Sequence, residues 1–264
     1  MGIESKSIEF HEKEPKHNTV VVDFLRHGTT KYEENFKTDE EKALLKGKYP
    51  KDLTAEGEAE VLATAKTIVD TINPETDIVA FWSSPAWRAQ GSEEIIKELL
   101  DKKRAIVYKD SEISSMRSFD QYDQDFMNDL WAKIAPTGKS AEMMYSRDPE
   151  FQIKNDKFES QPEVKERAGR VFEYITRLAK TINLDGKRLR LIGVSHFEFL
   201  NPILEDIFGQ KLETGEGFKK GEDIRITFDF DCATKEMKVS ADFRGEHKDN
   251  ILFDSESRRF LTKD

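Results

Sequence analysis

The chain contains a single cysteine, Cys232, among its 264 residues. One thiol cannot form an internal disulfide, and it cannot build a metal site with several cysteine ligands. A secreted protein with one unpaired thiol is unusual, so the cysteine count favours a reducing compartment. We therefore expect a cytoplasmic protein.

Long apolar runs and an excess of basic residues are also missing. No segment approaches the length of a membrane-spanning helix, and residues 1–19 form a polar leader rather than a secretory signal. The 42 Lys and Arg residues are outnumbered by 52 Asp and Glu residues, which gives a formal charge of −10. Nucleic acids and membrane surfaces favour a basic face, so we expect neither as a partner.

Strand-like and helix-like segments alternate between residues 20 and 245, which we interpret as one domain. Strands are expected at 20–25, 77–82, 105–108 and 188–194, and helices at 54–73, 87–100, 162–182 and 196–209. Residues 113–160 show weak periodicity and predict a cap-like insertion, 223–230 and 235–243 alternate like a hairpin, and 246–264 form a charged, frayed tail. The pattern predicts a three-layer α/β/α sandwich whose sheet is mostly parallel, with an antiparallel C-terminal addition.

Polar motifs follow three of the predicted strands. Arg26-His27 follows the first strand, the segment from Ser84 to Arg88 follows the second, and Ser195-His196 follows a later one. Ligands of such sheets bind beyond the carboxyl ends of the strands. The three motifs are therefore expected to meet at one rim of the sheet.

These residue types suit phosphoryl transfer. A neutral imidazole is a good nucleophile toward phosphorus, and the planar fork of arginine binds two phosphate oxygens at once. Two histidines and two arginines could hold and attack a phosphate without a metal, while a carboxylic acid protonates the leaving alkoxide. The other histidines, His11, His17 and His247, lie in charged flanks, so we expect no metal site and no cofactor.

The motifs carry a resemblance to a known family. Leu25-Arg26-His27-Gly28-x-Thr30 resembles the signature of the histidine phosphatase superfamily, the phosphoglycerate-mutase-like enzymes. Three further segments resemble the family's motifs in the expected order: Leu53-Thr54-x-x-Gly57, Ser84-Pro85-x-x-Arg88-Ala89 and Val194-Ser195-His196. The resemblance spans residues 20–245 and implies the fold described above.

The resemblance also implies roles for single residues. His27 would be the residue that is phosphorylated, with Arg26, Arg88 and His196 around the phosphate. Thr30 would bind phosphate or brace the loop. Glu112 falls where many members place the proton donor, in a loop after the third strand, and Glu198 is its rival.

Two positions depart from the family pattern. Phe197 stands where many members have glycine after the second histidine, so it would narrow the pocket beside the phosphate or turn the loop. Glu33 stands where mutase-like members place an asparagine that contacts phosphate. A carboxylate there would repel phosphate, so either Asn35 serves instead or the contact is absent.

The function that follows is hydrolysis of a small phosphomonoester through a phosphohistidine at His27, without a metal. Two alternatives remain open at this stage: a mutase that returns the phosphoryl group to its substrate, and a sensor of phosphate ligands without activity. The sequence leaves the identity of the substrate and the oligomeric state open.

Overall fold

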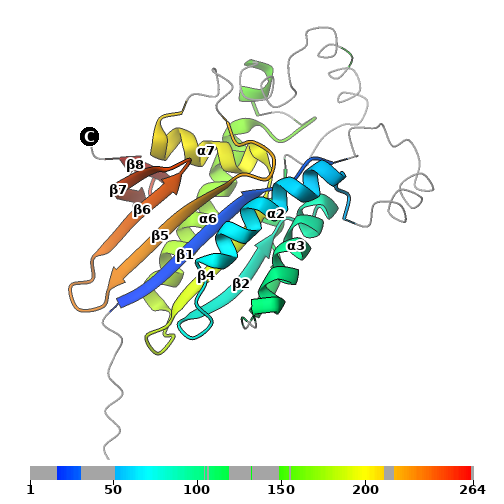
Figure 1. Ribbon diagram of the computed structural model, residues 1–264. Coiled ribbons are helices and arrows are strands. Elements are labelled where there is room, and N and C mark those ends of the chain that lie inside the picture. The colour runs from blue at the N-terminus through cyan, green and yellow to red at the C-terminus, as the bar shows by residue number, and fades with distance from the viewer. Residues whose placement is uncertain are drawn as a thin grey trace, which may run out of the picture.

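The computed structural model describes residues 17–30, 51–103, 105, 107–118, 132, 149–154, 156–210 and 217–262. Eight strands form one sheet in the order β3-β2-β4-β1-β5-β6-β7-β8 among these residues. Figure 1 shows how the sheet runs through the molecule. The expected α/β fold is confirmed.

The parallel half of the sheet carries the three motif-bearing strands. β1 (His17–Arg26) pairs in parallel with β4 (Arg188–Ser195), β4 with β2 (Asp77–Ser83), and β2 with β3 (Val107–Glu112). In this arrangement the carboxyl ends of β1, β2 and β4 lie at one edge. The register pairs Arg26 with Ser195 and Ser83 with Val194, so the residues that follow these strands begin side by side.

The antiparallel half is larger than the sequence predicted. β5 (Asp223–Asp231) pairs antiparallel with β1, and β6 (Met237–Phe243) follows as the expected hairpin. The expected frayed tail is wrong, because its residues form β7 (Glu246–Asp254) and β8 (Arg259–Thr262). Ile251, Phe253 and Phe260 are buried there, whereas most of the charged side chains around them face solvent.

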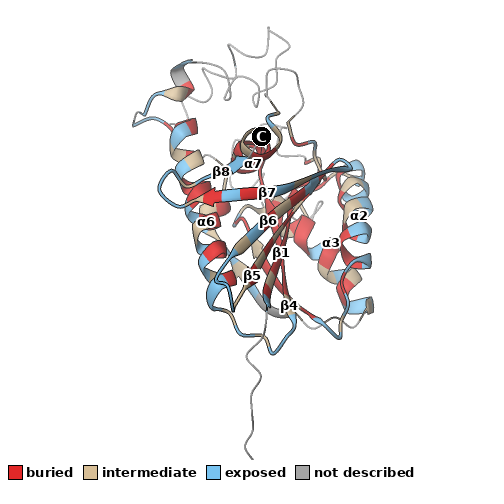
Figure 2. Cartoon of the chain, turned by 90° about the vertical axis from the view of Figure 1, so that its left-hand side faces the viewer, coloured by how far each residue is buried: buried red, intermediate tan, exposed pale blue. Residues whose placement is uncertain are grey.

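Helices cover both faces of the sheet. α2 (Ala55–Asp70) and α3 (Trp87–Lys103) pack on one face, and α6 (Gln161–Thr181) and α7 (Phe197–Phe208) on the other (Figure 2). Each face has its own buried apolar cluster, and β1 supplies Leu25 to one and Phe24 to the other. Two short 3-10 helices, Ser114–Met116 and Pro149–Gln152, complete the described elements. None of the helices among the described residues is long and apolar enough to cross a membrane.

The sequence also specifies where helices begin and end. Thr54 is the N-cap of α2, and its side chain accepts a hydrogen bond from the Gly57 amide (2.9 Å). Ser160 and Glu163 form a capping box at the start of α6. Gly209 ends α7 in a left-handed conformation with φ of 63°.

Candidate active site

His27 lies at the end of β1 with its ring held in one orientation. The ring is buried, and Nδ1 lies 2.8 Å from the carbonyl oxygen of Gly28. A carbonyl can only accept, so Nδ1 carries the proton and Nε2 keeps its lone pair. Nε2 accepts a hydrogen bond from Arg88 Nε at 3.2 Å. His27 is thus presented as a neutral imidazole with Nε2 as the nucleophilic nitrogen.

The surroundings keep this imidazole neutral. Burial lowers the pKa of His27 well below 6.5, and the guanidinium groups of Arg88 and Arg26 lower it further, against a smaller opposite effect of the bond to Gly28. The Lys220 ammonium adds a smaller effect in the same direction. An imidazole that stays neutral at physiological pH is the form that can attack phosphorus.

Arg88 joins the two histidines. It is the second residue of α3, and besides its bond to His27 its Nη2 donates to His196 Nδ1 at 3.1 Å. The two imidazole rings lie with their centroids 5.1 Å apart. Arg88 therefore directs one N–H group at each ring. An oxyanion bound between the two histidines could accept hydrogen bonds from the same N–H groups.

His196 is oriented from its other side by Ser84. Because Arg88 donates to Nδ1, the proton of His196 is on Nε2, which donates to Ser84 Oγ at 2.7 Å. Burial lowers the pKa of His196 well below 6.5, and Arg88 lowers it further. His196 follows β4 and Ser84 follows β2, so the motifs that were expected to converge lie in contact.

Arg26 is fixed by groups from the segment before β5 and from α7. Its Nη1 donates to the carbonyl oxygen of Phe218 at 2.6 Å, and its guanidinium lies 5.2 Å from the centre of the Phe197 ring. Phe197 is buried at the first position of α7. Its observed contact is thus with the arginine of the motif, and its predicted place beside the phosphate stays a prediction.

The loop after His27 packs closely on the first turn of α2. A Cβ at Gly28 would lie 2.3 Å from the carbonyl oxygen of Gly57, so neither position has room for a side chain. Thr30 bridges Leu53 through the backbone and is buried, and its Oγ1 forms no hydrogen bond within the described residues. The predicted role of Thr30 in binding phosphate stays a prediction. Asn35, the other predicted contact, lies outside the described residues.

Glu112 is placed differently from the prediction. The third strand spans Val107–Glu112 rather than 105–108, so Glu112 is the last residue of the strand and not part of a following loop. Its side chain is exposed, and Oε1 accepts a hydrogen bond from Gln90 Nε2 at 2.6 Å. In the register of the sheet Glu112 pairs with Ser83, the last residue of β2, so Glu112 still lies at the rim.

Two charged residues near the site were missed by the sequence analysis. Lys220 belongs to the segment before β5, where the Gly221 amide donates to the carbonyl oxygens of Arg26 (3.1 Å) and His27 (3.3 Å). Asp52 is buried and lies within the electrostatic reach of Arg88. Neither residue follows a predicted strand, so no local pattern pointed to them.

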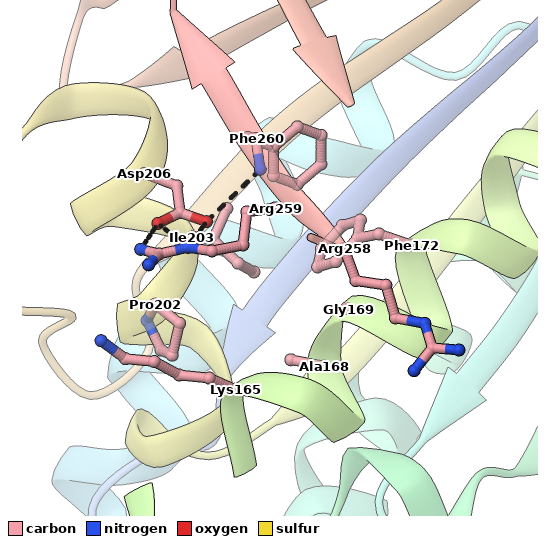
Figure 3. A pocket seen from close by; sticks show the side chains of 10 residues that line it. All are labelled: Lys165, Ala168, Gly169, Phe172, Pro202, Ile203, Asp206, Arg258, Arg259 and Phe260. Atoms are coloured by element: carbon pink, nitrogen blue, oxygen red, sulfur yellow. Dashed lines mark hydrogen bonds and ion pairs between the residues drawn. The ribbon is translucent and has the colours of Figure 1, made fainter. Parts of the chain in front are cut away.

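A separate shallow hollow lies between α6, α7 and β8 (Figure 3). Its cations are bound to carboxylates: Lys165 to Glu205 at 2.7 Å, Arg258 to Glu173 at 3.1 Å, and Arg259 to Asp206.

In the part of the chain that the structure describes, no group of three or more His, Cys, Asp or Glu side chains is placed to hold a metal ion.

A comparison with models of known protein families finds one match. The model of the histidine phosphatase superfamily (branch 1) matches residues 22–231. No curated protein matches the chain.

Solved structures resemble the chain at low sequence identity. Mycobacterial hydrolase 1 has a TM-score of 0.50 at 13% identity, with 84% of this chain and 97% of that chain covered. A mycobacterial glucosyl-3-phosphoglycerate phosphatase has a TM-score of 0.48 at 13% identity, with 84% and 97% covered. A phosphoglycerate mutase from Plasmodium falciparum has a TM-score of 0.40 at 11% identity, with 89% and 98% covered. The likeness to mycobacterial hydrolase 1 shows a similar fold and nothing more. The two structures with lower TM-scores carry no argument.

Proposed function

The chain belongs to the histidine phosphatase superfamily, and from this membership and the geometry of the rim we propose that it hydrolyses a small phosphomonoester through a phosphohistidine at His27. The observation that carries the proposal is the state of His27: a buried neutral imidazole, with Nδ1 bonded to Gly28 and Nε2 turned toward Arg88. A structural histidine would need no such arrangement of cations around an unprotonated nitrogen.

In the first step the Nε2 lone pair attacks phosphorus in line with the ester oxygen. The N–P bond forms as the P–O bond to the leaving group breaks. Arg88 shifts its N–H groups from the two imidazoles to phosphate oxygens, and Arg26 supplies a second positive charge. The leaving oxygen takes its proton from a carboxylic acid, for which Glu112 at the end of β3 is our candidate.

In the second step water attacks the phosphorus of phosphohistidine, and the N–P bond breaks. Inorganic phosphate is released and His27 returns to its neutral state. The carboxylate that gave its proton in the first step can accept one from the attacking water. All of these groups are side chains of the protein, so the proposed cycle needs no metal ion.

Trapping the intermediate tests the proposal. Acid-free quenching during turnover of a labelled phosphomonoester should leave an acid-labile, base-stable phosphoryl group on His27, in the presence of EDTA as in its absence. His27→Ala should lose label and activity together, by about 10⁴-fold or more in kcat. His247→Ala, at an exposed histidine of β7, is the matched control and should keep both.

Three results would contradict the proposal. Full activity in His27→Ala would exclude the nucleophile, and loss of wild-type activity in EDTA would point to a metal enzyme. Transfer of the label to a second substrate molecule, with no release of inorganic phosphate, would identify a mutase instead of a phosphatase.

A further inference from the structure

Asp52 is a carboxyl group that the proposed reaction does not use. It lies between the loop of His27 and the first turns of α3. The next residue, Leu53, bridges Thr30, and the carbonyl oxygen of Lys51 lies so close to α3 that a Cβ at Gly91 would be 2.1 Å from it. Only 6% of Asp52 is exposed.

The side chain of Asp52 is poorly compensated for a buried carboxyl. No hydrogen bond or ion pair joins it to another described residue, whereas the neighbouring Lys51 is paired with Glu98 at 2.7 Å. Its backbone is left-handed, with φ of 51°, a conformation that Asp and Asn tolerate better than most residues. A buried polar group without partners is uncommon and calls for an explanation.

The charged group that acts on Asp52 is Arg88. Burial raises the pKa of the Asp52 carboxyl from 3.8 to about 6, while the Arg88 guanidinium lowers it. Glu56, in the first turn of α2, is exposed, and His27 stays neutral because its pKa is lowered. Arg88 is therefore the described cation that Asp52 and a bound phosphate would share.

We propose that Asp52 is a counter-charge to Arg88 that weakens the binding of phosphate oxyanions when it is ionised and so promotes release of inorganic phosphate. The inference rests on the proposed phosphate pocket around Arg88. An ionised carboxylate repels an arriving dianion, and from a distance it offsets part of the positive charge of the guanidinium. Protonation of the carboxyl removes both effects.

The sign of the pH dependence of anion affinity follows from the linkage between anion binding and protonation of Asp52. Below about pH 6 the carboxyl is neutral and the site binds oxyanions tightly. Above that pH it becomes ionised and the affinity falls. Since binding of an anion raises the pKa of a nearby carboxyl, binding takes up a proton, and each pKa unit of that rise corresponds to about a tenfold difference in affinity.

Sulfate is a suitable probe because it remains a dianion throughout this range. For the wild-type protein we expect the Kd for sulfate, measured by competition with a chromogenic phosphomonoester, to rise about tenfold between pH 5 and pH 8. Asp52→Asn should bind sulfate with little dependence on pH, and about tenfold more tightly than wild type at pH 8. Asparagine keeps the size of the side chain and suits the left-handed backbone.

Asp185→Asn is the matched control. Asp185 has the same residue type and nearly the same φ of 52°, but it is exposed in the turn before β4, at the opposite end of that strand from His196. Its sulfate affinity should follow the wild-type curve at every pH.

The outcomes separate the two proposals. If sulfate fails to compete with substrate in wild type, the proposed phosphate pocket itself is wrong, and the role of Asp52 falls with it. If sulfate competes but its affinity is the same at pH 5 and pH 8 in wild type, Asp52 is not a counter-charge, and this result needs no variant to fold. If Asp52→Asn keeps wild-type sulfate affinity but loses activity only on poor leaving groups, Asp52 is a proton donor and the inference is overturned.

Discussion

Among the described residues, the positive charges of the rim and those of the hollow have different partners. At the rim, Arg88 donates to two imidazoles and Arg26 donates to a backbone carbonyl. The rim carboxylate Glu112 accepts from an amide. In the hollow between α6, α7 and β8, Arg259 is bound to the carboxylate of Asp206 (Figure 3), and Lys165 and Arg258 are also bound to carboxylates.

The difference concerns what each place can do. A cation that is bound to a carboxylate has its charge largely cancelled, and an anionic ligand would have to displace that partner. Hydrogen bonds to neutral imidazole and carbonyl groups occupy the N–H groups of an arginine without cancelling its charge. Arg88 directs its N–H groups at the two histidines, where the proposed reaction needs an anion to bind. We therefore expect the rim to bind anions and catalyse, with an affinity that Asp52 limits, and the hollow to stabilise the packing of α6, α7 and β8.

Among the substitutions that test the difference between the rim and the hollow, Glu112→Gln should have the largest effect on kcat. An acid matters most for a poor leaving group such as an alkoxide, so Glu112→Gln should lose about 10²–10⁴-fold in kcat on an alkyl phosphate. The loss should be much smaller on p-nitrophenyl phosphate, whose leaving group needs no proton. The two substrates are compared in steady-state assays.

Glu198→Gln is the control for that prediction, because Glu198 lies in the first turn of α7 beside His196. A selective loss in Glu198→Gln would move the role of proton donor to that residue. If neither variant distinguishes the two substrates, the assignment of Glu112 is withdrawn.

The arginines allow the same substitution in both regions. Arg88→Lys keeps the charge but loses the planar fork that reaches both histidines, so kcat/KM should fall by about 10²-fold. Arg258→Lys makes the same change in the hollow and should leave kcat/KM unchanged. Steady-state kinetics of the two variants, each checked for folding by circular dichroism, decide the matter. Equal effects of the two substitutions would remove the distinction between rim and hollow.

The rim could be predicted from the sequence because its residues follow strands directly. Arg26-His27, Ser84 and His196 each come within a few positions of a β-branched or apolar run, and parallel strands bring such positions to one edge. The spacing of these residues in the sequence does not specify which atoms donate and which accept. That information comes from the hydrogen bonds between Arg88 and the two imidazoles.

Other parts were misjudged for identifiable physical reasons. β3 is an edge strand, where charged residues such as Lys109 and Asp110 are tolerated, so its second half was read as a loop. β7 and β8 were read as a tail because most of their residues are exposed and charged, and only a few buried side chains, such as Phe253 and Phe260, reveal the strand pattern. Asp52 reaches Arg88 only through the packing of α3 on the segment before α2, a contact that no local pattern encodes.

The smallest expected effect lies in the hollow. Lys165 on α6 and Glu205 on α7 are bound at 2.7 Å, with 28% and 24% of their side chains exposed. Partly exposed pairs of this kind contribute about 0–1 kcal/mol, and salt screens them. Lys165→Gln should therefore lower the free energy of unfolding in urea by at most about 1 kcal/mol, and the loss should shrink in 1 M salt, a concentration at which the screening length is about 3 Å. Combined with Glu205→Gln in a double-mutant cycle, the coupling energy should equal the loss that salt removes. Neither substitution should change kcat or KM, because neither side chain touches the rim. A fall in activity with unchanged stability would mean that the charges of the hollow act on the reaction, and the two regions would then have to be treated as one site.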